Sequence, residues 1–114
     1  MTRPEPEFVP DRGDAIWLQF TPQAGHEQAG RRPALVLSPQ AYNRKTGLAL
    51  VCPITSQIKA YPFEVLIPAG GGVSGVVLAD QVKSVDWIAR QAAYIDSVPP
   101  AVVTRTLGLM QTLL

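Results

Sequence analysis

The sequence has very little of several residue types on which protein chemistry often depends. Its 114 residues include one cysteine, Cys52, and one histidine, His26. A lone cysteine cannot form an internal disulfide, which fits a reducing compartment. One cysteine, one histidine and dispersed acids cannot assemble a convincing zinc site. With a single histidine available as base, a hydrolase triad of nucleophile, base and orienting acid is also poorly supported.

Long apolar runs and nucleotide-binding motifs are lacking too. The apolar run at residues 48–54 is far shorter than the roughly 18 residues that a membrane span needs. The glycines at 70–72 lack the strand, lysine and helix context of a phosphate-binding or dinucleotide-binding loop. No export signal is recognised at the N-terminus. We therefore expect a cytoplasmic protein without membrane contact, metal or nucleotide cofactor.

What the chain does contain is ample material for one small core. Hydrophobic residues make up 46% of the chain and charged residues only 17%, which argues against disorder. Residues 1–10 are polar, acidic and rich in proline, which predicts a flexible leader, and residues 11–114 form the single expected domain. The low charge leaves apolar surface that a symmetric partner could cover, so we expect a homodimer.

Positive charge is concentrated in one part of the chain. The net charge is only +1, but residues 28–63 contain five cations and no acid. Such a region could attract a polyanion such as nucleic acid, although scattered, solvated cations would give the same count. The five cations are Arg31, Arg32, Arg44, Lys45 and Lys59.

Short segments with strand-like patterns follow one another closely. Ile16, Leu18 and Phe20 alternate with Trp17, the period of a strand with one buried face. Further strands are predicted at 33–37, 48–54, 63–67, 76–78, 81–85 and 92–95. Residues 21–30 and the stretch between 37 and 48, with its proline and glycine, are expected to be loops.

The C-terminal stretch changes to a helical period. Val103, Leu107, Met110 and Leu114 form one stripe of an amphipathic helix, and Ser97 with two prolines marks its start. Many short strands followed by one helix predict a mainly β protein, a small antiparallel barrel with a C-terminal α-helix, and not alternating βαβ units.

Two polar clusters stand next to predicted strands. Arg31 and Arg32 directly precede the strand at 33–37, and the planar guanidinium group is well suited to bind phosphate oxygens. Thr55, Ser56 and Gln57 follow the strand at 48–54, with Lys59 and Tyr61 just beyond. If the two strand ends adjoin, arginines, hydroxyls and an aromatic ring face one groove that could hold and split an RNA phosphodiester.

Four sequence blocks extend these clusters, and they occur in a fixed order at characteristic spacing. They read VPDxGDxIW at 9–17, EQAGxRPAxVLSP at 27–39, YPFEV at 61–65 and LADQVKS at 78–84. With these blocks, the chain from about residue 9 to 87 resembles the MazF family of bacterial toxins. The C-terminal helix matches that family only in type.

The resemblance implies an SH3-like barrel with a terminal helix, dimerised so that RNA lies along the joint face. It also implies metal-free cleavage of single-stranded RNA at short sequences, by attack of the ribose 2′-hydroxyl on phosphorus. The catalytic arginine of the family falls on Arg32, and its catalytic threonine falls on Thr55. Because arginine is a poor proton acceptor, Arg32 is expected to stabilise the transition state while Thr55 donates a hydrogen bond to the phosphate.

The proton acceptor is left open, with Glu27 as the first candidate and Asp80 as the alternative that some relatives suggest. Structural roles compete at these positions: Thr55 could simply end its strand, and Asp80 could cap a turn. Two departures from family members, Arg31 and Ala60, are expected to affect sequence preference more than catalysis. The residues expected to bind RNA are Gln28, Arg31, Ser56, Gln57, Lys59, Asp80 and Gln81.

Two other functions are considered beside the sequence-specific endoribonuclease. One is a toxin of the same fold that binds and poisons DNA gyrase, although the C-terminal helix gives this little support. The other is a binding module that holds RNA without cutting it. For the endoribonuclease, the expected partner is an antitoxin with an acidic segment that folds over the basic groove and competes with RNA.

Overall fold

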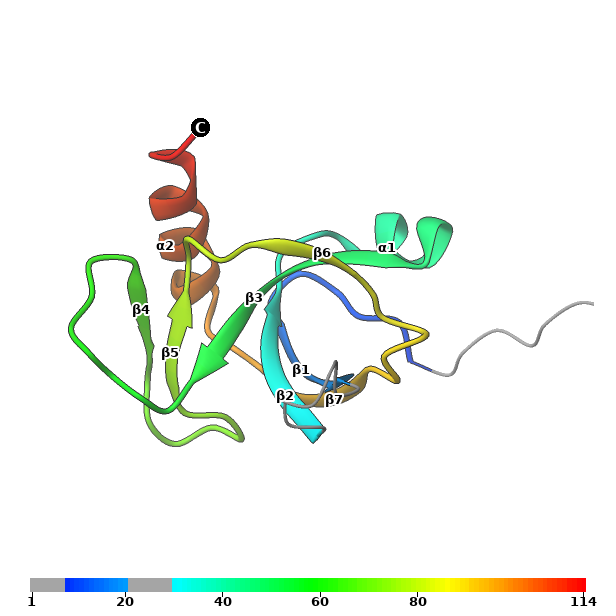
Figure 1. Ribbon diagram of the computed structural model, residues 1–114, viewed down its shortest axis with the longest axis horizontal. Helices are drawn as coiled ribbons and strands as arrows, with labels where there is room; N and C mark the ends of the chain where they lie inside the picture. The colour runs from blue at the N-terminus through cyan, green and yellow to red at the C-terminus, as the bar shows by residue number, and fades with distance from the viewer. Residues whose placement is uncertain (1–7, 21–29) are drawn as a thin grey trace, which may run out of the picture.

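The computed structural model describes residues 8–20 and 30–114. Within them the chain forms a curled antiparallel sheet with the strand order β4-β5-β3-β2-β1-β7, and β6 pairs with β3. Figure 1 shows the sheet curling into a half-barrel, with α2 beside β4 and β5 and α1 at the start of β3. The expected mainly β, SH3-like barrel with a C-terminal helix is therefore confirmed. The strands are β1 Asp14–Phe20, β2 Gly30–Val36, β3 Leu48–Thr55, β4 Glu64–Ile67, β5 Gly75–Leu78, β6 Lys83–Asp86 and β7 Ala93–Ser97, and the helices are α1 Gln40–Thr46 and α2 Pro100–Gln111.

The central strands bury both of their faces, which explains their nearly continuous apolar sequences. In β2, Leu35 contributes to a core that α2 covers, whereas its neighbours Ala34 and Val36 contribute to a second core on the other face. Strand β3 divides in the same way, with Cys52 on the first side and Val51 on the second. Because side chains alternate along a strand, one register serves both cores.

The second core also includes the segment before β1. Val9 and Pro10 are buried, and Phe8 makes an edge-on contact with Tyr94 at 5.9 Å between ring centroids. Phe8 and Val9, from the last three residues of the predicted leader, thus contact the second core. Residues 1–7 lie outside the described part of the chain.

The loop expected between the second and third strands contains a two-turn helix, α1. Pro39 precedes it in an extended conformation, and Gly47 ends it with a left-handed φ of 73° that favours glycine. Asn43 holds the helix to the core: its side-chain amide donates to the backbone oxygens of Pro10 and Ser38 at 2.8 and 3.0 Å. A segment of seven residues is too short to show a clear helical periodicity, so the sequence pattern did not reveal this helix or its anchor.

Replacing Asn43 with alanine is expected to destabilise the domain by about 2–4 kcal/mol, because buried oxygens on two other segments lose their donor. Urea denaturation measures the loss. Arg44→Ala is the matched control, since Arg44 is exposed in the same helix and its loss should cost less than about 0.5 kcal/mol. Equal stability of the two variants would contradict the anchoring role of Asn43.

The terminal helix differs slightly from its predicted stripe. Val102 and Thr106 are its most buried residues, and Leu107 and Met110 pack against the first core. The helix ends at Gln111, so Leu114 lies beyond it and is 97% exposed. Neither described helix is long and apolar enough to cross a membrane.

Candidate RNA-binding groove

A groove of about 1200 Å³ runs along the end of the sheet where β2 begins and β3 ends. Among the described residues that line it are four cations, Arg31, Arg32, Lys59 and Lys83, and one carboxylate, Glu64. The four positive charges and one negative charge leave a local surplus of three. A groove with this charge attracts polyanions and repels acids.

The antiparallel pairing of β2 and β3 brings Arg32 and Thr55 to the same place. Ala34 pairs with Pro53, and Arg32 and Thr55 lie two residues further toward the same end of the two strands. An offset of two preserves the face, so both side chains project from the side of the sheet that carries Ala34 and Pro53. Both residues line the groove. Sequence reasoning required only that the two strand ends adjoin, and they do.

The hydroxyl of Thr55 is arranged to donate a hydrogen bond. Its Oγ1 accepts one from the backbone N–H of Gln57 at 3.1 Å. A hydroxyl has one proton to donate and two lone pairs. With the Gln57 N–H on one lone pair, the proton is available for an oxygen in the groove.

Arg31 projects from the opposite face of β2 and stacks on an aromatic ring. Its guanidinium carbon lies 4.8 Å from the ring centroid of Trp17, which fixes the cation at the rim of the groove. Neutral residues at this position would lack that contact. The adjacent arginines thus present their charges from two faces of one strand.

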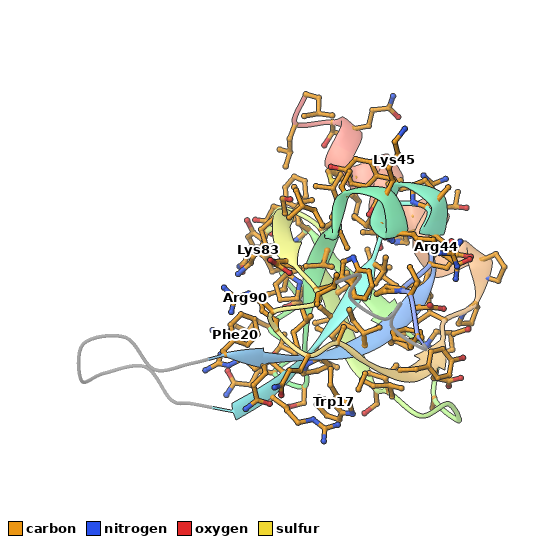
Figure 2. All side chains as sticks on the ribbon, turned by 90° about the vertical axis from the view of Figure 1, so that its right-hand side faces the viewer. Trp17, Phe20, Arg44, Lys45, Lys83 and Arg90 are labelled. Atoms are coloured by element: carbon orange, nitrogen blue, oxygen red, sulfur yellow. The ribbon has the colours of Figure 1, made fainter. Side chains whose placement is uncertain are left out.

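A second aromatic ring gathers cations that sequence reasoning missed. Lys83 and Arg90 lie 6.0 and 4.7 Å from the ring centroid of Phe20, and Figure 2 shows the three side chains together at one edge. Lys83 reaches the groove because it pairs with Val51 of β3, on the same face as Pro53 and Thr55. Only the β3–β6 register identifies it, and no spacing in the sequence does. Arg44 and Lys45, counted in the basic stretch, lie on α1, away from Trp17 in Figure 2, and do not line the groove.

Most of the predicted RNA-binding residues line the groove. Glu27 and Gln28 lie outside the described part of the chain, so their placement is not described. Asp80 does not line the groove, because its carboxylate turns toward the neighbouring loop and accepts a hydrogen bond from Tyr61. The predicted residues that line the groove are Arg31, Arg32, Thr55, Ser56, Gln57, Lys59 and Gln81.

The loop at 56–62 forms one wall of the groove and has defined supports. The backbone N–H of Lys59 donates to Glu64 Oε2 at 3.0 Å. Ala60 has a φ of 55°, in the left-handed region that disfavours a β-carbon. A glycine would satisfy this position without strain. Residues 40–46, which were expected to lie in a loop, form helix α1 and do not line the groove.

No group of three or more metal-ligating side chains is present in residues 8–20 and 30–114. The described side chains that line the groove carry guanidinium, ammonium, hydroxyl, amide and carboxylate groups. These are the groups that bind and polarise a phosphodiester.

Comparison with known proteins identifies the family. Residues 11–114 match the model of the PemK-like, MazF-like toxin of type II toxin-antitoxin systems. The chain is 56% identical over 93 residues to the endoribonuclease toxin MazF of Escherichia coli K12, covering 82% of this chain and 83% of that protein. It is 38% identical over 109 residues to the endoribonuclease PemK of Escherichia coli, covering 91% and 81%.

Solved structures agree with the sequence comparisons. A crystal structure of MazE-MazF from Deinococcus radiodurans superposes with a TM-score of 0.90 at 57% identity, covering 94% of this chain and 96% of that chain. A mycobacterial endoribonuclease in complex with its cognate antitoxin shares the fold, with a TM-score of 0.71 at 23% identity over 93% of this chain and 98% of that chain. The chain belongs to the family of PemK-like, MazF-like toxins of type II toxin-antitoxin systems.

Proposed function

We propose that this toxin is a metal-independent endoribonuclease that cuts single-stranded RNA at short sequences. The observation that carries the proposal is the meeting of Arg32 and Thr55 at one end of neighbouring strands, inside a groove with a surplus of positive charge. The relatives reported above are named endoribonucleases, which supports the same activity. None of those names refers to gyrase, so the gyrase-binding alternative gains no support.

The proposed reaction is an internal transesterification. The ribose 2′-oxygen attacks the adjacent phosphorus and loses its proton to a base, while the bond from phosphorus to the 5′-oxygen breaks and that oxygen takes up a proton. The products are a 2′,3′-cyclic phosphate and a free 5′-hydroxyl. Negative charge accumulates on the phosphoryl oxygens as the new bond forms, and preorganised donors stabilise it.

In this proposal Arg32 and Thr55 are the donors. The guanidinium of Arg32 contributes a permanent charge and two parallel N–H groups that match two phosphoryl oxygens. Thr55 adds its hydroxyl proton, which the Gln57 N–H leaves available. Glu27 is the proposed proton acceptor. Asp80 is less suited to accept the proton, because one carboxylate oxygen accepts a hydrogen bond from the Tyr61 hydroxyl and the other is buried.

We further propose two protein partners in a bacterial cytoplasm. A second copy of the chain would cover apolar side chains such as Leu48, Leu50 and Ile88, which are 37–40% exposed. An antitoxin with an acidic segment would occupy the basic groove. MazE is the partner in the Deinococcus complexes, whose MazF resembles this chain. Rising salt should weaken antitoxin and RNA binding in parallel, because both depend on the same cations.

The test of this function is incubation of the purified protein with a long single-stranded RNA in excess EDTA. We expect cuts at one recurring short sequence, with a DNA of the same sequence left intact because it lacks the 2′-hydroxyl. The ends are mapped by primer extension. Intact RNA, or cleavage that EDTA abolishes, would contradict the proposal.

A further inference from the structure

Asp80 has an unusual environment behind the groove wall. Its Oδ2 accepts a hydrogen bond from the Tyr61 hydroxyl at 2.6 Å. Its Oδ1 is buried and has no hydrogen-bond partner among residues 8–20 and 30–114. Burial and, next, the negative charge of Asp80 raise the pKa of the Cys52 thiol to about 12.

A buried carboxylate oxygen without a partner is costly, so its retention calls for a compensating role. The carboxylate makes one strong, charge-assisted bond, and that bond is to Tyr61. The same bond is the main cause that raises the pKa of Tyr61, which keeps the phenol protonated and donating. Asp80 thus acts on Tyr61 and not on the groove itself.

Tyr61 is the member of the pair that substrate can touch. It lines the groove, and 45% of its surface is exposed. Two hydrogen bonds hold the backbone around it: the Glu64 N–H donates to the backbone oxygen of Tyr61 at 3.0 Å, and the Ala79 N–H donates to the backbone oxygen of Phe63 at 2.9 Å. The ring of Phe63 lies 5.9 Å away, tilted by 45°. With the hydroxyl anchored as well, the ring has little freedom to turn.

A fixed, exposed aromatic ring is a good platform for a nucleobase. Stacking on such a ring tolerates any base, and holding the side chain in advance removes part of the entropy cost of binding. Tyr61 and Thr55 line the same groove, so one bound RNA can contact both the ring and the hydroxyl.

We infer that Asp80 is a positioning residue that acts through Tyr61, and that the Tyr61 ring stacks against a base of the bound RNA. This inference rests on the proposed function. It differs from a role of Asp80 as proton acceptor, because that role needs a carboxylate oxygen facing the 2′-hydroxyl. The two roles predict different effects of the same substitutions.

The experiment measures kcat and KM on an RNA oligonucleotide that carries the sequence cut by the natural chain. Asp80→Ala and Tyr61→Phe each break the hydrogen bond and should raise KM by about five- to tenfold, with kcat changed less than about threefold. Asp80→Asn keeps an oxygen that accepts from the tyrosine, so it should restore KM to within about threefold of the natural value. Tyr61→Ala removes the platform and should raise KM by about five- to 150-fold.

The double variant Asp80→Ala with Tyr61→Phe should be no worse than either single variant, because both remove the same bond. Thermal melting identifies any variant that fails to fold. If Asp80→Ala fails to fold, Tyr61→Phe alone still tests whether KM rises while kcat changes little. A collapse of kcat in Asp80→Asn, multiplicative effects in the double variant, or an unchanged KM in Tyr61→Ala would overturn the inference. Failure of the natural chain to cut any RNA would instead remove the proposed function.

Discussion

Arg32→Ala is expected to lower kcat for RNA cleavage by about 100- to 1,000-fold, the usual cost of removing one preorganised donor from a developing oxyanion. The melting temperature should change little, because Arg32 is exposed and substitutions at such positions usually stay within about 0.5 kcal/mol. Arg32→Lys should recover only part of the rate, since an ammonium cannot donate two parallel N–H groups. Single-turnover cleavage of a short RNA measures each effect.

Arg44→Ala is the matched control for charge. Arg44 is an exposed arginine of the same basic stretch, but it lies on α1 and does not line the groove. Its loss should leave the cleavage rate unchanged. If the two variants lost activity equally, a diffuse positive field would explain catalysis and the local role of Arg32 would be wrong.

Gly75→Ala is expected to damage both folding and catalysis. Gly75 has a φ of 110°, and a β-carbon there would lie 2.2 Å from the backbone oxygen of Thr55 and 3.1 Å from the Cα of Ser56. The left-handed φ costs about 1–2 kcal/mol and forced overpacking adds about 1–3 kcal/mol. For a domain of about 100 residues the melting temperature should fall by more than roughly 8 °C. Thr55 must also shift relative to Arg32, so cleavage well below the melting temperature should fall at least about tenfold.

Gly70→Ala separates the conformational cost of a positive φ from the steric clash with Thr55. Gly70 has a similar φ of 105°, but a β-carbon there would meet nothing within 4 Å. This variant should show only the conformational cost and should cut RNA at the natural rate. Identical stability and activity in the two alanine variants would contradict the close approach of Gly75 to Thr55.

The sequence predicted the strands well because their apolar runs are clear and their turns carry glycine or proline. Arg32 and Thr55 could be proposed for a similar reason: each stands at the end of such a run, and the structure brings both to the groove. Helix α1 was missed because its stability comes from Asn43, whose partners Pro10 and Ser38 are set by the tertiary structure. Local pattern has no means of revealing such an anchor.

The remaining parts of the groove depend on pairing between distant strands. Lys83 enters the groove only because β6 pairs with β3 in a register that places it beside Val51. The role of Asp80 depends on contact with Tyr61, 19 positions earlier in the chain. Residue type alone made Asp80 a candidate proton acceptor, and only the geometry connects it to an aromatic ring.

One substrate tests directly whether Arg32 and Thr55 promote attack by a 2′-hydroxyl. An RNA oligonucleotide carrying the cut sequence is made with a single 2′-deoxyribose on the 5′ side of the cut bond. We expect this oligonucleotide to bind as tightly as the all-ribose form but not to be cut, while the all-ribose form gives a 2′,3′-cyclic phosphate. Cleavage of the deoxy-substituted oligonucleotide at the same bond would contradict this mechanism, because the nucleophile would then be water or a protein group.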